Sequence, residues 1–229
     1  MLRALIPSRL RQAARRTFDR CFHRQGLGLV KLGKICTWTV LESRLKAGAM
    51  VISGGAGNDI SFEVELAEKY SCRVAVFDPS PTGQKTFDAL AERNANLTFH
   101  PIGLSAETCM VRFAEPINAA EGSFKIPVNS ANVVELPCVS PREALSSAGL
   151  TDIELLKIDI EGFEYDFLGK MIEQGIRPSQ IAVEFHHFMP KVSLRRTLRS
   201  LWRLRRAGYV IAHKEQCDFL LLHKSVIHS

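Results

Sequence analysis

The chain has 229 residues, enough for one well-packed domain and an extension. Its composition is that of an ordinary globular protein, and no apolar run approaches the roughly 20 residues needed to span a bilayer. The net charge of +6 is uneven, because residues 1–34 carry nine Lys or Arg against one Asp, which leaves −2 for the rest. We therefore divide the sequence into a basic, helical extension, residues 1–36, and a domain, residues 37–229.

Cysteines and arginines indicate the compartment. Six cysteines are scattered without a CxxC pair, which speaks against a disulfide framework or a zinc site and favours reduced thiols. Arginines interrupt the apolar runs near the start, so a secretory signal peptide is not expected. These features predict a cytoplasmic protein, with peripheral membrane contact through residues 1–34 as an open alternative.

Two helices are predicted before the first strand of the domain. One begins at Ser8, and the other covers residues 37–46, after an irregular stretch at residues 25–32. The first has an apolar stripe that recurs every four residues with arginines on its other faces. This helix can pack on the domain, or it can lie on an anionic membrane or an acidic glycan. A third alternative is a transit peptide, which Asp19 and the small number of serines make less favoured. The stripe consists of Leu10, Ala14, Phe18 and Phe22.

Residues 50–78 predict the first unit of a Rossmann-like sheet. An apolar run is followed by three glycines, a helical stripe and a second β-rich run, which ends in Asp78 about 20 residues beyond the glycines. Glycines allow a sharp turn and close approach of a ligand, and a carboxylate at a strand end can accept hydrogen bonds from both ribose hydroxyls. We expect a nucleoside site, the alternative being a tight turn with a surface Asp. The glycines are Gly54, Gly55 and Gly57.

The α/β pattern continues beyond this unit. The third strand ends in a turn where Gly103 would lie near an adenine, although its proline and glycine can equally just terminate the strand. Residues 115–130 form a loop that either carries substrate contacts or merely connects elements. The predicted elements are a helix at residues 84–94, strands at residues 97–101 and 133–139, and a short helix at residues 141–147.

Polar side chains gather at the ends of two later strands. A buried strand runs into Asp159 and Glu161, and the strand at residues 180–185 carries Glu184 just before His186. In open α/β sheets ligands bind at these strand ends, where such groups can accept a substrate proton or hold a divalent cation. The alternatives are first-turn helix chemistry for Glu161 and a structural imidazole for His186. No metal site is predicted, because no two-histidine helix spacing or CxxC supports one.

The chain closes with a basic helix and two strands. The helix, residues 193–207, is expected to expose its arginines and to pack through an apolar stripe, with nucleic-acid or membrane contact as the less favoured alternative. Strands at residues 209–213 and 219–223 are spaced like a hairpin. The sequence therefore predicts an α/β fold with about seven mostly parallel strands, one antiparallel strand and helices on both faces. The stripe consists of Leu194, Leu198, Leu201 and Trp202.

Several motifs resemble the FkbM family of methyltransferases over roughly residues 48–223, in the family's order. They are SGGAGNDISFE, VAVFDPSP, FHPIGLSAE, LLKIDIEGFEYDFL, IRPSQIAVEFHHF and RRAGYVIAHK. The resemblance implies the class I methyltransferase fold with S-adenosyl-L-methionine as cofactor. It further implies that the three glycines wrap the methionine portion, that Asp78 holds the ribose, and that Asp159 and Glu161 lie by the transferred methyl group.

The glycine loop departs from the family pattern at two positions. Many members have an acid where this chain has Ile52, and a third glycine where it has Asn58. Asp59 or Glu63 is expected to take over contact with the cofactor's amino group. For the base that removes a hydroxyl proton, Asp159 is the first candidate and His186 the second, beside Glu161 and Glu184.

These observations predict an O-methyltransferase that acts on a hydroxyl of a sugar, glycan or small metabolite. A nucleic-acid methyltransferase is the main alternative, favoured by the arginines but opposed by the slightly acidic core and by the missing Asn-Pro-Pro-aromatic motif, so nucleic acid is not expected as a partner. A non-catalytic binding module is a second alternative. A dehydrogenase is disfavoured, since GxGxxG is missing.

Overall fold

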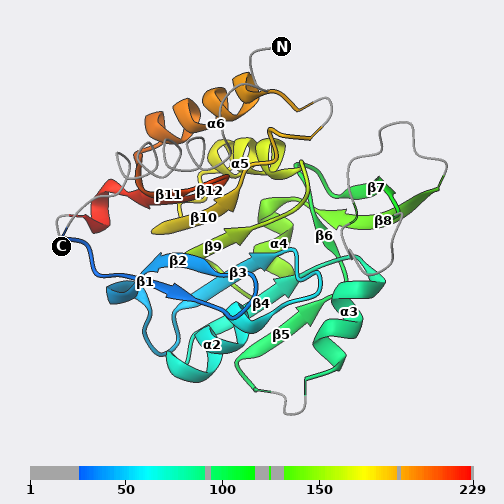
Figure 1. Cartoon of the computed structure of the whole chain (residues 1–229), viewed down its shortest axis with the longest axis horizontal. Helices are drawn as coiled ribbons and strands as arrows, with labels where there is room; N and C mark the ends of the chain where they lie inside the picture. Colours follow the sequence, from blue (N-terminus) through cyan, green and yellow to red (C-terminus); the bar gives the residue numbers. More distant parts are fainter. Residues whose placement is uncertain (1–25, 91–93, 117–123, 125–131, 190–191, 228–229) are drawn as a thin grey trace, which may run out of the picture.

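A seven-stranded sheet forms the centre of the computed structural model, which describes residues 26–90, 94–116, 124, 132–189 and 192–227. Its order is β11-β12-β10-β9-β3-β4-β5 (Figure 1). Within this sheet β12 alone runs antiparallel to the other strands, which confirms the predicted fold. The strands are β3 (Met50–Gly54), β4 (Arg73–Phe77), β5 (Leu97–His100), β9 (Leu155–Ile158), β10 (Gln180–Glu184), β11 (Tyr209–Glu215) and β12 (Asp218–His223).

The order of the strands reverses beside β3. From β3 the chain passes through α2 (Ser61–Lys69) to β4 and through α3 (Pro81–Asp88) to β5 on one side. It later adds β9 and β10 on the other side, so β9 and β4 are the two neighbours of β3. Such a reversal leaves a crevice at the carboxyl ends of the strands, where open α/β sheets bind ligands. The predicted strand–glycine turn–helix–strand unit is confirmed.

Side chains of the central strands alternate between two hydrophobic cores. On β3, Val51 faces one core and Ile52 the other. The core around Ile52 is closed by α4 (Pro141–Ser147), α5 (Glu164–Glu173) and α6 (Leu194–Arg206), and the core around Val51 by α2, α3 and an N-terminal hairpin. Burial on both faces is why these strands read as continuous apolar runs in the sequence.

The N-terminal hairpin replaces two predicted features. Strands β1 (Leu29–Leu32) and β2 (Trp38–Leu41) pair antiparallel, and a 3-10 turn, η2 (Glu42–Arg44), follows. The irregular stretch at residues 25–32 and the helix at residues 37–46 were therefore wrong predictions. The hairpin is held on the sheet because the Gln180 side chain accepts a hydrogen bond from the backbone N–H of Leu41 at 2.8 Å.

The predicted division of the chain falls inside this hairpin. The boundary between residues 36 and 37 lies in the turn that joins β1 to β2, so the described residues before it pack with the domain. The helix predicted from Ser8 lies outside the described residues. For residues 1–25 the division therefore stays a prediction.

The second crossover helix begins earlier than predicted. It was expected at residues 84–94, whereas α3 begins at Pro81 and ends at Asp88. Ser80 caps its first turn by accepting a hydrogen bond from the N–H of Gly83 at 3.0 Å, and proline suits the first helical position. The sequence signal for this helix start is Ser80 followed by Pro81.

A second, three-stranded sheet extends from the main one. The strand predicted at residues 133–139 is confirmed as β8 (Val133–Val139), but it pairs with β6 (Gly103–Leu104) and β7 (Cys109–Ala114) instead of the central sheet. The short helix predicted at residues 141–147 is confirmed as α4. Most of the loop predicted at residues 115–130 lies outside the described residues.

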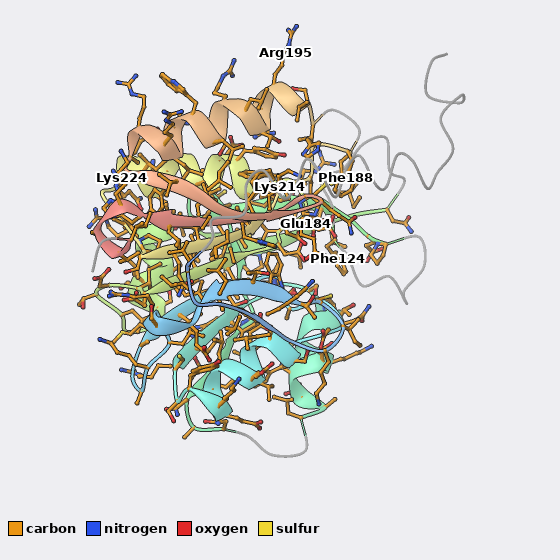
Figure 2. The ribbon with its side chains drawn as sticks, turned by 60° about the vertical axis from the view of Figure 1, so that its left-hand side comes forward. Phe124, Glu184, Phe188, Arg195, Lys214 and Lys224 are labelled. Carbon is orange, nitrogen blue, oxygen red and sulfur yellow. The ribbon has the colours of Figure 1, made fainter. Side chains whose placement is uncertain are left out.

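Helix α6 turns its predicted packing stripe mostly toward solvent. Leu194, Leu198 and Trp202 are 55%, 58% and 56% exposed, whereas the helix buries Thr197, Ser200 and Leu204. In Figure 2 the labelled Arg195 points away from the sheet. The stripe was therefore a wrong prediction of the buried face, apart from the partly buried Leu201. Among the described residues, no helix combines the length and apolarity needed to cross a membrane.

Two substitutions on α6 are expected to differ sharply in stability. Leu204→Ala should lower the free energy of unfolding by about 2–5 kcal/mol, because it opens a cavity in the core. Trp202→Ala should change it by no more than about 1 kcal/mol, since the ring is exposed and contacts the Arg206 guanidinium at 4.7 Å. Urea denaturation of both variants measures the difference. An equal loss in both would mean that the outer face of α6 is covered in the folded protein.

Candidate active site

A cavity of about 240 Å³ lies where the strand order reverses. We call it the strand-end cavity, because the residues that follow β3, β4 and β9 form its floor. The rings of Phe113 and Phe163, whose centres lie 5.0 Å apart, belong to its wall. Phe124, labelled in Figure 2, lines it as well. These aromatic side chains were not predicted as site residues, because only the folded chain brings them to the strand ends.

The three predicted glycines have different physical roles. Gly54 and Gly55 fit tight backbone packing: a Cβ on Gly54 would lie 2.6 Å from the Leu104 side chain, and one on Gly55 only 1.9 Å from the carbonyl oxygen of Asp159. Gly55 also has a φ of +85°. Gly57 (φ +51°) faces open space instead. Gly55 and Gly57 line the strand-end cavity, whereas Gly54 lies behind it.

Asp78 fixes the shape of the glycine loop. Its Oδ2 accepts hydrogen bonds from the backbone N–H groups of Ala56 (2.8 Å) and Gly57 (3.0 Å), and its Oδ1 accepts one from Ser80 (2.7 Å). Gly83 lets α3 approach this carboxylate, since a Cβ there would lie 2.5 Å from the Asp78 carboxyl carbon. Asp78 lines the cavity beside Gly103, and its expected contact with a ribose stays a prediction.

Asp59 lines the cavity and joins two loops. Its Oδ2 accepts hydrogen bonds from the N–H groups of Cys36 (2.7 Å) and Ile35 (3.2 Å), and its Oδ1 accepts one from Ser61 (3.0 Å). Partial burial alone would raise the pKa of Asp59, but these hydrogen bonds to Cys36, Ser61 and Ile35 outweigh it and lower the pKa. The group is therefore an ionised carboxylate at the rim of the cavity.

Glu63 lies in the core and not in the cavity wall. It is 1% exposed, and its Oε1 lies 3.6 Å from the Lys157 ammonium and accepts a 2.5 Å hydrogen bond from Ser53. Lys157 in turn donates to the carbonyl oxygen of Gly55 at 2.5 Å and lies 5.2 Å from the centre of the Trp38 ring. Glu63 therefore bears on the glycine loop through Lys157. The lone lysine in the apolar strand LLKI was the signal that sequence reasoning missed.

Beyond β9 the chain brings an imidazole against the predicted acids. Asp159 and Glu161 line the cavity, and the His186 Nε2 lies 3.5 Å from the Asp159 Oδ1 and 3.5 Å from the Glu161 Oε2. Glu164 holds this arrangement from behind: it is fully buried and accepts backbone hydrogen bonds from Gly162 (2.8 Å) and His186 (2.9 Å). Its positioning role was not predicted, although the acid itself belongs to the IDIEGFE motif.

Glu184 belongs to a second hollow beside the strand-end cavity. This acidic hollow has a volume of about 230 Å³ and includes Asp159, Glu184 and Asp218. Glu184 on β10 and Asp218 on β12 are directly paired across the sheet. The two cavities share Asp159 together with Ile35 and Cys36. Figure 2 shows Glu184 at the same end of the molecule as Phe124.

The carboxylates of Asp159, Glu161, Glu184 and Asp218 and the His186 imidazole form a cluster at these strand ends. The cluster holds several negative charges and is partly shielded from water. Burial and the nearby charge of Asp159 raise the pKa of Glu184 to about 7. Burial and the same charge raise the pKa of Asp218 to about 6. Burial alone would lower the pKa of His186, but the carboxylates of Glu164, Glu161 and Asp159 raise it to about 9. Cationic groups are thus favoured here, whether a proton on the imidazole or another cation.

Comparisons with known proteins find one family model and several solved structures. The model of the methyltransferase FkbM domain matches residues 48–211. Among solved structures, a fibrillarin pre-rRNA processing protein of Methanococcus jannaschii is 13% identical, with a TM-score of 0.46 over 79% of this chain and 69% of that chain. A methyltransferase from Pyrococcus furiosus is 12% identical, with a TM-score of 0.39 over 92% and 96%.

A third structure, TYW2 of M. jannaschii in complex with AdoMet, is 10% identical, with a TM-score of 0.36 over 87% of this chain and 85% of that chain. No curated protein matches the chain. At such identities and TM-scores the solved structures add nothing about activity. The family model, in contrast, covers most of the sequence, including Asp78, Asp159 and Glu184. The chain therefore belongs to the FkbM methyltransferase domain family.

Proposed function

We propose that this methyltransferase uses S-adenosylmethionine to methylate a hydroxyl group of a sugar, glycan or small metabolite. One observation carries the proposal: the strand-end cavity and the acidic hollow are adjacent and share Asp159. A methyl donor and an acceptor need two sites that meet at one point, with a group there that can take a proton. The carboxylates support a hydroxyl acceptor, because they can accept its hydrogen bond and take its proton as general bases.

The strand-end cavity offers partners for each part of the cofactor. Gly57 leaves the backbone open to the methionine portion, Gly55 lines the same cavity, and the ionised Asp59 complements the ammonium group of the cofactor. The Asp78 carboxylate can accept hydrogen bonds from ribose hydroxyls, and Gly103 lines the same cavity, where the adenine is expected. Glu63 makes no direct contact in this assignment, because it does not line the cavity.

The acceptor oxygen would attack the sulfonium methyl carbon in line with the breaking carbon–sulfur bond. Bound S-adenosylmethionine would supply the methyl group and leave as the neutral thioether, while the proton of the acceptor hydroxyl would pass to a carboxylate of the cluster. Asp159 borders both cavities, and Glu184 with its pKa near neutrality is poised to accept a proton. A positioned base contributes about 10²–10⁴-fold. His186 holds a proton at neutral pH, so its role is that of a counter-ion.

Transfer of a labelled methyl group tests this proposal. The full chain is incubated with S-adenosylmethionine labelled in its methyl group and with separate panels of sugars, oligosaccharides, RNA and DNA. We expect label in a sugar or another polyhydroxyl compound as an alkali-stable methyl ether. Label that enters only RNA or DNA, on a base nitrogen, would contradict the proposed acceptor class and support the nucleic-acid alternative.

Gly57→Ala is expected to weaken cofactor binding, while its loss of stability should equal that of the control Gly149→Ala. Gly57 and Gly149 both have positive φ (+51° and +64°), and a Cβ at either would meet no atom within 4 Å. Each alanine should therefore cost about 1 kcal/mol of stability. Gly57 lines the cavity, so its variant should also bind S-adenosylhomocysteine at least tenfold more weakly in calorimetry. Equal affinities for Gly57→Ala and the control Gly149→Ala would contradict the assignment of this cavity.

A further inference from the structure

We propose that Asp159, Glu184 and His186 bind a divalent cation at the border of the strand-end cavity and the acidic hollow. One ligand atom from each side chain lies within 4.8 Å of the other two. Two atoms held about 2.2 Å from one ion are about 3.1 Å apart when adjacent and about 4.4 Å apart when opposite. Small rotations of the two partly exposed carboxylates would therefore close the site around an ion.

The orientation of His186 is the second observation that indicates a ligand. The residue is 2% exposed, and its Nδ1 lies 3.3 Å from the Oε1 of the buried Glu164. A carboxylate that accepts a hydrogen bond from Nδ1–H fixes the orientation of the ring. In the neutral imidazole the free electron pair then lies on Nε2. This Nε2 points into the cluster. Its two carboxylate neighbours at 3.5 Å are beyond good hydrogen-bond distance.

Charge in the cluster also favours a cation. Four carboxylates approach one another at these strand ends, and Glu184 is paired with Asp218 directly across the sheet. Lys157 of the strand-end cavity and Lys31 of the acidic hollow have other partners, Glu63 and Glu215. The cluster therefore carries an excess of negative charge. A divalent ion would neutralise it, in place of the proton on His186.

The ligand set indicates which ion and which acceptors fit. Two carboxylate oxygens and one imidazole nitrogen form a mixed set that suits Mn²⁺ and related ions, and three protein ligands leave coordination positions open. Open positions toward the acidic hollow would take the oxygens of the acceptor. An ion there would favour compounds with two adjacent hydroxyls and would lower the pKa of the hydroxyl that is methylated. This consequence rests on the proposed function, whereas cation binding itself does not.

Titration of the full chain with MnCl₂ tests the site. Free Mn²⁺ is followed by electron paramagnetic resonance in the unmodified chain and in Glu184→Gln, Asp159→Asn and Glu173→Gln. Glu173 is the control, because it pairs with Arg203 on the outer surface of α5 and α6. We expect one site, with at least tenfold weaker binding in the first two variants and unchanged binding in the control. Equal binding in all four proteins would overturn the proposal.

A second measurement uses the unmodified chain and does not depend on the folding of a variant. In crystals grown with MnCl₂, the anomalous signal of manganese should lie between Asp159, Glu184 and His186. An ion elsewhere, or none at millimolar MnCl₂, would overturn the site. Calorimetry with S-adenosylhomocysteine on the same sample separates the two proposals. A chain that binds S-adenosylhomocysteine but not Mn²⁺ would overturn the cation site alone. A chain that binds Mn²⁺ but not S-adenosylhomocysteine would support the cation site and contradict the proposed function.

Discussion

Glu63→Ala is expected to lower the free energy of unfolding by about 3–5 kcal/mol, the cost of leaving a buried charge without its partner. Lys157 is 3% exposed, and without Glu63 its ammonium group keeps only the Gly55 carbonyl and the face of the Trp38 ring. The Ser53 hydroxyl would lose its acceptor as well. Urea denaturation followed by circular dichroism measures the change.

Two further variants test whether the buried charge is the cause. Glu63→Leu combined with Lys157→Met removes both charges and should recover most of the lost stability. Glu173→Ala breaks an exposed ion pair with Arg203, and its cost should be about 0–1 kcal/mol. If Glu63→Ala cost no more than this control, the ion pair would not hold the glycine loop from below.

Asp78→Ala is expected to weaken binding of S-adenosylhomocysteine by about 100-fold or more. The carboxylate would supply charged hydrogen bonds to the ribose, each worth about 1.5–3 kcal/mol, and a tenfold change corresponds to about 1.4 kcal/mol. The variant also frees the N–H groups of Ala56 and Gly57, so the loop would lose its preformed shape. Calorimetric titration of each protein with S-adenosylhomocysteine measures the loss.

The controls for Asp78 separate charge from shape. Asp78→Asn keeps the size of the side chain but loses one acceptor, so its affinity should lie between those of the unmodified chain and the alanine variant. Asp88→Ala changes an acid on the outer side of α3, where the side chain meets Gln84, and should leave affinity unchanged. A folded Asp78→Ala that binds as tightly as the unmodified chain would remove the ribose from this position.

The central sheet could be predicted because its strands carry a strong local signal. Runs such as those of β3, β9 and β10 are mostly apolar without a polar–apolar alternation, which is the pattern of strands buried on both faces. The acids that follow them needed one further rule, that parallel strands end at the same edge of a sheet. Together these rules brought Asp78, Asp159 and Glu184 to the edge where the two cavities lie.

Features that depend on distant contacts were not predictable in the same way. The ion pair of Glu63 and Lys157 joins α2 to β9, and no spacing in the sequence predicts that these two residues meet. The N-terminal hairpin is stabilised by its packing on the sheet, where Gln180 bonds the backbone of Leu41. On α6 arginines surround both apolar faces, so periodicity alone could not tell that Leu204 is buried and Trp202 exposed.

Binding of S-adenosylmethionine in the strand-end cavity is the central claim of the proposed function. Calorimetric titration of the unmodified full chain with S-adenosylmethionine, and separately with S-adenosylhomocysteine, tests it most directly. We predict one site per chain for each compound, with either compound displacing the other. A well-folded chain that gives no binding heat with either compound at about millimolar concentration would contradict this account of the strand-end cavity and favour a non-catalytic module.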